Sequence, residues 1–338
     1  MLNACFTSLK RFFARFGSRG GTLFFSKTGT EVYVHSAKVL GEGGFSTVLL
    51  ATDVSTSTRC YALKKVIVQP SDECSQRSIF AELKSYMLFK HPHIMSLIDS
   101  FHEETSKGHV THYLLFPLMK KGTLRNELND GLKNDPQRLQ KDIGKVLLDF
   151  QKICSALNYM HTLTPTKYIH QDIKPENILM DGEPMLTDFG SVREAEVSID
   201  KRSRALAISE EAAIFCTMPY RAPCLFDPHT GTQLDSRTDV WGIGCLLFAF
   251  WFGYSPFECE FTSTGTVKVV ECSLSRILAK IPRPPAGRAS ENDTFIADFV
   301  EWILVHDMKR RPFCADILER LQRTSVSVNK AAIAMMPV

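Results

Sequence analysis

Hydrophobic and polar residues alternate along the first third of the chain, with the period of two that half-buried strands show. Apolar positions at steps of three and four predict one helix within this region, over residues 75–89. The proline at position 92 ends it, because the residue before a proline disfavours helical geometry. Strands are predicted over residues 32–41, 48–51, 59–68, 95–98 and 113–116.

The pattern becomes helical from residue 122 onward. Apolar residues at steps of three and four between positions 143 and 157 predict a long helix with one buried stripe. Residues 237–252 are apolar on nearly all sides, which indicates a buried central helix. A strand-rich part followed by a helical part predicts an α+β fold with two lobes. Further helices are expected over residues 266–279, 294–305 and 314–321.

The distribution of charge separates the start of the chain from the rest. The 338 residues carry a net charge of +3, but residues 1–30 hold five basic residues and no acidic one, so the remainder carries −2. A body with so little charge is not expected to bind nucleic acid. The predicted division is a basic aromatic N-terminal arm (1–30), an N-terminal lobe (31–118), a C-terminal lobe (119–323) and a C-terminal tail (324–338).

The N-terminal arm interleaves aromatic and basic residues over positions 1–20, as helices that lie in a membrane interface do. Cys5 is a candidate for S-palmitoylation, whereas Leu2 excludes N-myristoylation, which needs glycine at that position. The same composition also fits a disordered tail or an organellar transit peptide. The expected location is cytoplasmic, with peripheral contact to an internal membrane as the alternative that the arm raises.

Cysteine spacing and the length of the apolar runs argue against two other classes of protein. The ten cysteines form no CxxC or CxC pair, which disfavours a clustered zinc or redox site, and we infer a reducing compartment. The longest apolar stretch, residues 240–252, is too short and too interrupted by glycine to span a bilayer.

A glycine-rich hairpin, GEGGFSTV at residues 41–48, joins two of the predicted strands. Glycine lets backbone N–H groups approach phosphate oxygens without a side chain in the way, although an ordinary turn explains the motif equally well when it is taken alone. On the next strand, Lys64 could reach the phosphates, with Glu82 on the following helix to hold it in place. Lys65, on the opposite face of that strand, is expected to be solvated.

Two polar motifs, HQDIKPENIL from His170 and LTDFG from Leu186, carry the candidate chemistry. Phosphoryl transfer needs an acceptor for the hydroxyl proton, metal ligands and positive charge near the transferred group. Asp172 fits the proton acceptor and Lys174 the positive charge. The set occurs in order, which disfavours the alternative that these side chains merely cap turns. The oxygen donors that suit the hard cation Mg²⁺ are Asn177 and Asp188.

Taken in order, these motifs resemble those of a eukaryotic protein kinase over residues 32–321. TMPYRAP at 217–223 resembles the substrate-docking segment, and DVWGIG at 239–244 resembles a later structural signature. The phrases LGEGGFS, LFP, KGTL, DFGS and RTDVW are similar to the Numb-associated kinase family in particular. The resemblance implies a serine/threonine protein kinase that uses Mg²⁺ and ATP and acts on proteins, with Lys174 and Thr217 in the serine/threonine-specific pattern.

The resemblance also implies roles for individual residues. Phe116 would line the back of the adenine pocket, and the backbones of Leu118 and Met119 would meet the purine. The implied catalytic set is Lys64, Glu82, Asp172, Lys174 and Thr217. The implied nucleotide-binding set is Leu40, Gly41, Glu42, Gly43, Gly44, Phe45, Ser46, Val48, Ala62, Lys64, Phe116, Leu118, Met119, Lys174, Glu176, Asn177, Leu179 and Asp188, with Asn177 and Asp188 as the metal ligands.

Two positions depart from the family pattern. Gln171 replaces an arginine that commonly pairs with a phosphorylated activation segment, so we expect activity without such a phosphate. Cys224 replaces a glutamate that pairs with the arginine matching Arg311. Loss of one partner from a buried ion pair costs roughly 3–5 kcal/mol unless something compensates, so a compensating neighbour is expected.

A pseudokinase and a small-molecule kinase are the two alternatives to an active protein kinase. A pseudokinase would bind nucleotide as a scaffold, but such proteins lack part of the catalytic set that is complete here. A small-molecule kinase is disfavoured by the docking segment. Near-helical spacing over residues 203–215 predicts a helix inside the activation segment, against the alternative of a flexible loop.

Overall fold

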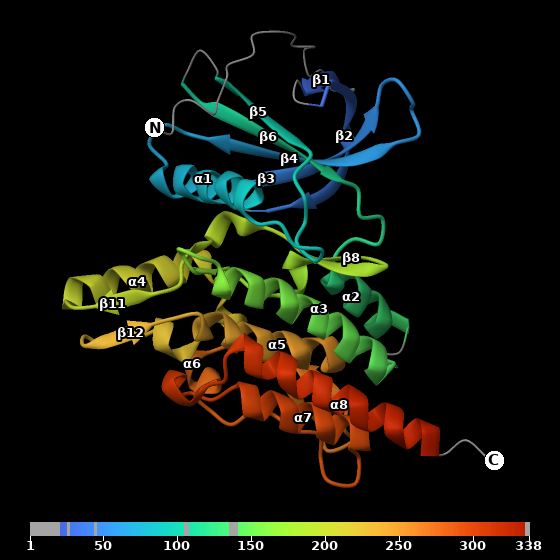
Figure 1. Cartoon of the computed structure of the whole chain (residues 1–338), viewed down its shortest axis with the longest axis vertical. Helices are drawn as coiled ribbons and strands as arrows, with labels where there is room; N and C mark the ends of the chain where they lie inside the picture. The colour runs from blue at the N-terminus through green and yellow to red at the C-terminus, as the bar shows by residue number, and fades with distance from the viewer. Residues whose placement is uncertain (1–20, 26–27, 44–45, 105–107, 135–140, 335–338) are drawn as a thin grey trace. The chain divides into compact units, whose positions relative to one another are not determined.

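The computed structural model describes residues 21–25, 28–43, 46–104, 108–134 and 141–334, with the backbone alone at residues 24, 134 and 325–334 (Figure 1). The described chain divides into two compact units. The first comprises residues up to Lys90 together with Met95–Lys120, and the second comprises His91–Ile94 and the residues from Lys121 on. The α+β class predicted from the alternation of patterns is confirmed, because the first unit is strand-rich and the second is mainly helical.

The first unit is built on one antiparallel sheet of six strands in the order β1-β2-β3-β4-β6-β5. Alternate side chains such as Val32, Val34 and Leu63 point into a fully buried core, which is why this part of the sequence has a period of two. Its elements are β1 (Gly21–Phe25), β2 (Thr30–Glu42), β3 (Ser46–Asp53), β4 (Cys60–Val68), α1 (Glu73–Leu88), β5 (Asp99–Glu104) and β6 (Val110–Pro117).

Strand β1 belongs to the sheet, although the sequence prediction grouped residues 1–30 as an arm. Gly21–Phe25 pairs with β2, and the side chains of Leu23 and Phe25 are buried in the core. The sheet therefore begins about ten residues before the first predicted strand, because grouping by charge concealed a short apolar run. Residues 1–20, including Cys5, lie outside the described residues, so membrane contact through them stays a prediction. Within the described residues, no helix is long and apolar enough to cross a bilayer.

The second unit packs its helices around α5, and Figure 1 shows α3, α5, α7 and α8 as neighbours within it. Every residue of α5 from Thr238 to Phe252 is buried, which accounts for its nearly uniform apolar sequence. A Cβ added at Gly244 would lie 2.6 Å from Leu304, so glycine allows the chain after α7 to approach α5 closely. The helices are α2 (Leu124–Asn134), α3 (Ile143–Thr162), α4 (Arg202–Phe215), α5 (Arg237–Phe252), α6 (Leu274–Ile277), α7 (Glu291–Ile303) and α8 (Cys314–Ala334).

Short strands and 3₁₀ turns connect the helices of the second unit. The strands form two-stranded antiparallel pairs, β7 with β10, β8 with β9, β11 with β12 and β13 with β14. They are β7 (Tyr168–Ile169), β8 (Ile178–Asp181), β9 (Glu183–Leu186), β10 (Arg193–Glu194), β11 (Val197–Ile199), β12 (Thr232–Leu234), β13 (Cys259–Phe261) and β14 (Val267–Val269). The turns are η1 (Pro175–Asn177), η2 (Phe189–Ser191), η3 (Met218–Tyr220), η4 (Pro223–Leu225) and η5 (Met308–Arg310).

Three predictions of secondary structure were wrong. Residues 95–98 are not a strand, since the pairing strand β5 begins only at Asp99. Residues 266–279 are not one helix but hold β14 and the short α6, because Val267 and Val269 alternate with a lysine in a hairpin. The final helix does not end at residue 321, since the backbone of α8 continues to Ala334 through the predicted tail.

Candidate active site

Lys64 and Glu82 are held together in the first unit by β4 and α1. The Lys64 Nζ donates to both carboxylate oxygens of Glu82, at 2.8 and 2.9 Å. Glu82 is buried, and charged side chains are seldom buried unless they are paired. Helix α1 begins after Asp72, whose carboxylate accepts the backbone N–H of Ser75 at 3.0 Å and so fixes where the helix starts.

The pairing of β3 with β4 and of β4 with β6 places several predicted nucleotide-binding residues of the first unit opposite one another. Val48 on β3 lies opposite Lys64 on β4, and Ala62 on β4 lies opposite Phe116 on β6. The ring of Phe116 is buried, 5.0 Å from that of Tyr86. Other predicted members are the exposed Leu40 and Glu42 at the end of β2, and the half-buried Leu118 and Met119 after β6.

The glycine-rich hairpin lies between β2 and β3, as its sequence predicted. The backbone N–H of Gly43 donates to the carbonyl of Ser46 at 2.8 Å, which closes a tight turn. Among the described residues, no atom lies within 4 Å of a Cβ added at Gly41, so these residues leave room for a ligand beside its backbone. Gly44 and Phe45, also predicted to bind nucleotide, lie outside the described residues.

The second unit brings Asp172, Lys174 and Thr217 together in a triangle of contacts. The Lys174 Nζ lies 2.7 Å from Asp172 Oδ2 and donates to Thr217 Oγ1 at 2.8 Å. The backbone N–H of Thr217 donates to the other oxygen of Asp172 at 2.9 Å. Asn177 adds its Nδ2, which donates to the Asp172 carbonyl at 2.8 Å. Asp172 is therefore fixed from three sides, with a cation and a hydroxyl beside its carboxylate.

The protein kinase domain family matches residues 34–321 of this sequence. The chain belongs to that family. It is similar to serine/threonine-protein kinase 16 of Rattus norvegicus, at 34% identity over 288 residues that cover 84% of this chain and 87% of the relative. The Homo sapiens protein of the same name is 32% identical over 286 residues, with the same coverage. Serine/threonine-protein kinase ppk13 of Schizosaccharomyces pombe is 28% identical over 316 residues, covering 84% of this chain and 88% of the relative.

Membership of this family implies that the kinase uses ATP and a divalent metal ion. The donors at the predicted metal positions fit such an ion, because Asn177 and Asp188 offer amide and carboxylate oxygens. The Nδ2 of Asn177 donates to Asp172, and the amide oxygen of Asn177 takes no part in these two hydrogen bonds. Among the described residues, no three His, Cys, Asp or Glu side chains gather as a metal cluster. Phosphate oxygens of a bound nucleotide and water would supply further ligands to such an ion.

A buried carboxylate, Asp239 near the start of α5, positions the catalytic loop of the kinase. Its oxygens accept the backbone N–H groups of His170 and Gln171 at 2.7 and 2.8 Å, and the Nε2 of His161 at 2.9 Å. Burial opposes the charged form of Asp239, but the hydrogen bond from His161 and the nearby His170 outweigh it, so its pKa lies below the ordinary value. These bonds also hold Gln171 at a φ of +74°, a left-handed conformation that few residues other than glycine adopt.

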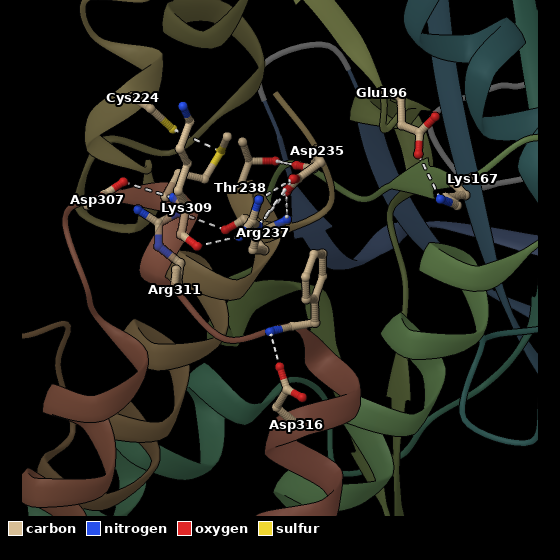
Figure 2. A network of polar contacts seen from close by, with 12 residues as sticks. Lys167, Glu196, Cys224, Asp235, Arg237, Thr238, Asp307, Lys309, Arg311 and Asp316 are labelled. Carbon is tan, nitrogen blue, oxygen red and sulfur yellow. Dashed lines mark hydrogen bonds and ion pairs between the residues drawn. The ribbon is translucent and has the colours of Figure 1, made fainter. Parts of the chain in front are cut away.

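Arg311 is surrounded by backbone carbonyls in place of the family's glutamate, and Figure 2 shows it beside one of these partners, Arg237. Its guanidinium donates to the carbonyls of Arg237, Val305 and His306 at 2.7, 2.9 and 3.3 Å. It also lies over the ring of Trp241, 5.0 Å from the centroid, and the residue is only 2% exposed. The compensation expected from the sequence is thus supplied by dipoles and an aromatic face.

The Cys224 thiol completes the surroundings of Arg311 without supplying a negative charge. Burial raises the pKa of this thiol, although the Arg311 guanidinium opposes the change, so it is neutral near pH 7. Its sulfur lies 4.0 Å from the sulfur of Met308 (Figure 2). The family's ion pair is therefore replaced by contacts between neutral groups and a buried cation.

The sequence reasoning missed one group of functional candidates, which surrounds Arg125 in the second unit. The carboxylate of Glu176, predicted only as a nucleotide-binding residue, accepts a hydrogen bond from Arg125 Nε at 2.9 Å. Glu258 and Tyr220 lie on the other side of the same guanidinium. No local motif signals this group, because its members come from four separate segments of the chain.

Proposed function

We propose that this kinase transfers the γ-phosphate of Mg²⁺-ATP to serine and threonine hydroxyls of proteins, without phosphorylation of its own activation segment. The observation that carries the proposal is the triangle of contacts among Asp172, Lys174 and Thr217. The names of the relatives, serine/threonine-protein kinases, support this class of hydroxyl. Similarity to serine/threonine-protein kinase 16 over most of both chains supports placement in the Numb-associated family.

The contacts of the triangle suggest a role for each member. A substrate hydroxyl beside Asp172 would pass its proton to the carboxylate as it attacks phosphorus. Lys174, which touches both other members, would neutralise charge that develops on the transferred group. Thr217 holds both side chains in place from the activation segment, so the position of that segment decides whether the loop is competent. A bound divalent cation would neutralise charge on the phosphates.

Helix α4 is the first reason to expect that no phosphate is needed. It begins at Arg202 and ends at Phe215, which confirms the helix predicted inside the activation segment, and it buries Ala205, Ile208 and Ala212. The Ser209 hydroxyl donates to the carbonyl of Phe226 at 2.9 Å. Burial of these apolar side chains stabilises the activation segment, and this stabilisation does not depend on phosphorylation.

The ion pair between Arg193 and Glu211 is the second reason to expect that no phosphate is needed. Arg193, which follows the DFGS motif on β10, lies 3.6 Å from a carboxylate oxygen of Glu211 on α4. Both side chains are largely buried, so solvent screens the pair less than an exposed one. Glu211 thus supplies the kind of negative charge that a phosphate supplies in kinases regulated through their activation segment.

The surroundings of Gln171 are the third reason. Gln171 carries no charge, so it offers nothing for a phosphate to pair with. Burial raises the pKa of the neighbouring Cys216 thiol to about 12, which keeps it neutral as well. Arg221 donates to the carbonyl of Cys216 at 2.8 Å and lies over the ring of Phe226, so this cation already has partners in the activation segment (residues 188–223) and just after it.

The test compares the rate of substrate phosphorylation before and after phosphatase treatment, with removal of phosphate checked by mass spectrometry. We expect the rate to stay within about twofold, since burial and the internal carboxylate order the segment. Glu211→Gln should lower the rate roughly two- to fivefold, the effect of losing one partly buried ion pair. Glu260→Gln is the matched control, because that carboxylate pairs with Arg276, outside the activation segment. Loss of activity on dephosphorylation would refute the proposal.

A further inference from the structure

The guanidinium of Arg125, at the start of α2, is bound on every side by partners from elsewhere in the second unit. It donates from Nη1 to the carbonyl of Gly253 at 2.7 Å and from Nη2 to the hydroxyl of Tyr220 at 3.2 Å. Its Nε donates to Glu176 at 2.9 Å, and its Nη2 lies 3.8 Å from a carboxylate oxygen of Glu258. The Arg125 side chain is only 16% exposed, whereas that of Glu176 is 44% exposed.

These partners adjoin the catalytic triangle in sequence. Glu176 follows Lys174 by two residues, and Tyr220 follows Thr217 by three. Lys174 and Thr217 both contact Asp172, where the substrate hydroxyl is proposed to react. Two residues of an extended peptide span about 7 Å, so a side chain that flanks the substrate serine would have the reach to contact residues close to Asp172. This reach makes the group around Arg125 a candidate for contact with a flanking side chain of the substrate.

The position that Arg125 occupies is built to hold a cation. Two carboxylates, a carbonyl and a hydroxyl oxygen converge on it, and these are the groups to which a guanidinium donates. Burial raises the pKa of Glu258, while Arg125 counteracts the change, so the guanidinium favours the charged carboxylate. Without the guanidinium, the same groups would attract a lysine or arginine from another chain.

We propose that Arg125 determines specificity by filling this cation-binding position with a side chain of the kinase itself, so that a basic residue of the substrate is not accepted there. The inference rests on the proposed function and adds a selectivity to it. A tethered group competes at an effective concentration near the millimolar range or above, which a free substrate at micromolar concentration does not match. The wild-type kinase therefore gains nothing from a basic residue at the flanking position and favours neutral or acidic ones.

The test measures kcat/KM for serine peptides in which one position at a time, from three before to three after the serine, is alanine, lysine or glutamate. Arg125→Gln keeps a hydrogen-bond donor on the side chain but removes the charge. We expect this variant to favour lysine over alanine at one flanking position by roughly five- to tenfold, the strength of a charge-assisted hydrogen bond that is partly exposed. Wild type should show no preference for lysine at that position.

Glu176→Gln is the second variant, and its expected effect has the opposite sign. It removes a carboxylate while the guanidinium stays, so glutamate should become favoured over alanine by roughly threefold at the same position. Arg283→Gln is the matched control, because Arg283 pairs with Asp298 and Glu301 away from these residues and should leave the profile unchanged. The Glu176 variant decides the matter if Arg125→Gln does not fold.

Three results would overturn the inference. The first is a folded, active Arg125→Gln whose peptide profile matches wild type within twofold, or, if it does not fold, an unchanged profile in Glu176→Gln. The second is a wild-type preference for lysine that Glu176→Gln abolishes, since the position would then be open to substrate. The third is an absence of phosphate transfer to any peptide or protein, in which case the proposed function fails and takes this inference with it.

Discussion

Asp239 and Arg311 are buried charges of opposite sign near the same end of α5, and the kinase stabilises them by different means. Asp239 accepts two backbone N–H groups and a histidine, whereas Arg311 donates to three backbone carbonyls and lies over Trp241. The positive end of the α5 dipole favours the carboxylate and disfavours the guanidinium. The dipole of α5 does not stabilise Arg311, so backbone carbonyl dipoles stabilise this cation in place of a charged partner.

The two charges also differ in function. Asp239 bonds to the loop that carries Asp172, so its loss should change chemistry as well as stability. Arg311 bonds to the start of α5 and to the chain between α7 and η5, so its loss should change stability alone. Variants at these positions test whether the two charges differ in this way.

Asp239→Asn should have the largest effect. The amide cannot accept from three donors at once as the carboxylate does, so we expect a loss of roughly 3–5 kcal/mol in the free energy of unfolding. We also expect loss of most phosphate transfer, since the loop before Asp172 loses its anchor. Urea unfolding and a transfer assay on the same preparation measure both effects. A variant that keeps full activity would contradict the role given to Asp239.

Arg311→Met should have a smaller effect, limited to stability. Three carbonyls lose their donor, but a cation no longer has to be buried, so the net loss should be roughly 2–3 kcal/mol. Urea unfolding measures it, and kcat of the folded fraction should stay near that of wild type. An unchanged free energy of unfolding would mean that the carbonyl contacts contribute nothing to the fold.

Cys224→Glu, compared with Cys224→Gln, tests whether the carbonyls satisfy the guanidinium completely. The two side chains match in shape, so their difference reports the charge alone. The lowered pKa of Arg311, which burial causes, leaves room for an anion to help. We therefore expect the glutamate variant to be more stable by about 1 kcal/mol in thermal or urea unfolding. Equal stability would show that the neutral contacts already satisfy the charge.

The pH dependence of the Asp239 effect should be the smallest signal. The folded-state pKa of Asp239 lies below 3.8, so its contribution is complete above that value and is lost only as the pH falls through the folded pKa. The difference in unfolding free energy between wild type and Asp239→Asn should therefore not shrink from pH 7 down to about pH 4.5. A difference that shrinks between pH 7 and pH 5 would contradict the lowered pKa.

Features of this kinase that depend on local sequence patterns could be predicted, whereas contacts between distant residues could not. The fold class and the helix at Arg202–Phe215 were predicted because hydrophobic periodicity is a local signal. The catalytic residues were named because they occur in short ordered motifs. The partners of Arg311 could not be named, since carbonyls of Arg237, Val305 and His306 carry no side-chain signature. The partners of Arg125 were missed for a related reason, because they come together only in the folded chain.

We propose that Asp172 accepts the substrate proton during phosphate transfer and that the kinase is active without phosphorylation. The most direct measurement is γ-phosphate transfer from Mg²⁺-ATP to a generic serine/threonine protein substrate, with dephosphorylated wild type beside Asp172→Asn. We expect transfer by wild type and its loss in the variant, with both proteins folded and binding ATP. Binding of ATP by both proteins without transfer by either, even to itself, would contradict the claim and favour a nucleotide-binding scaffold.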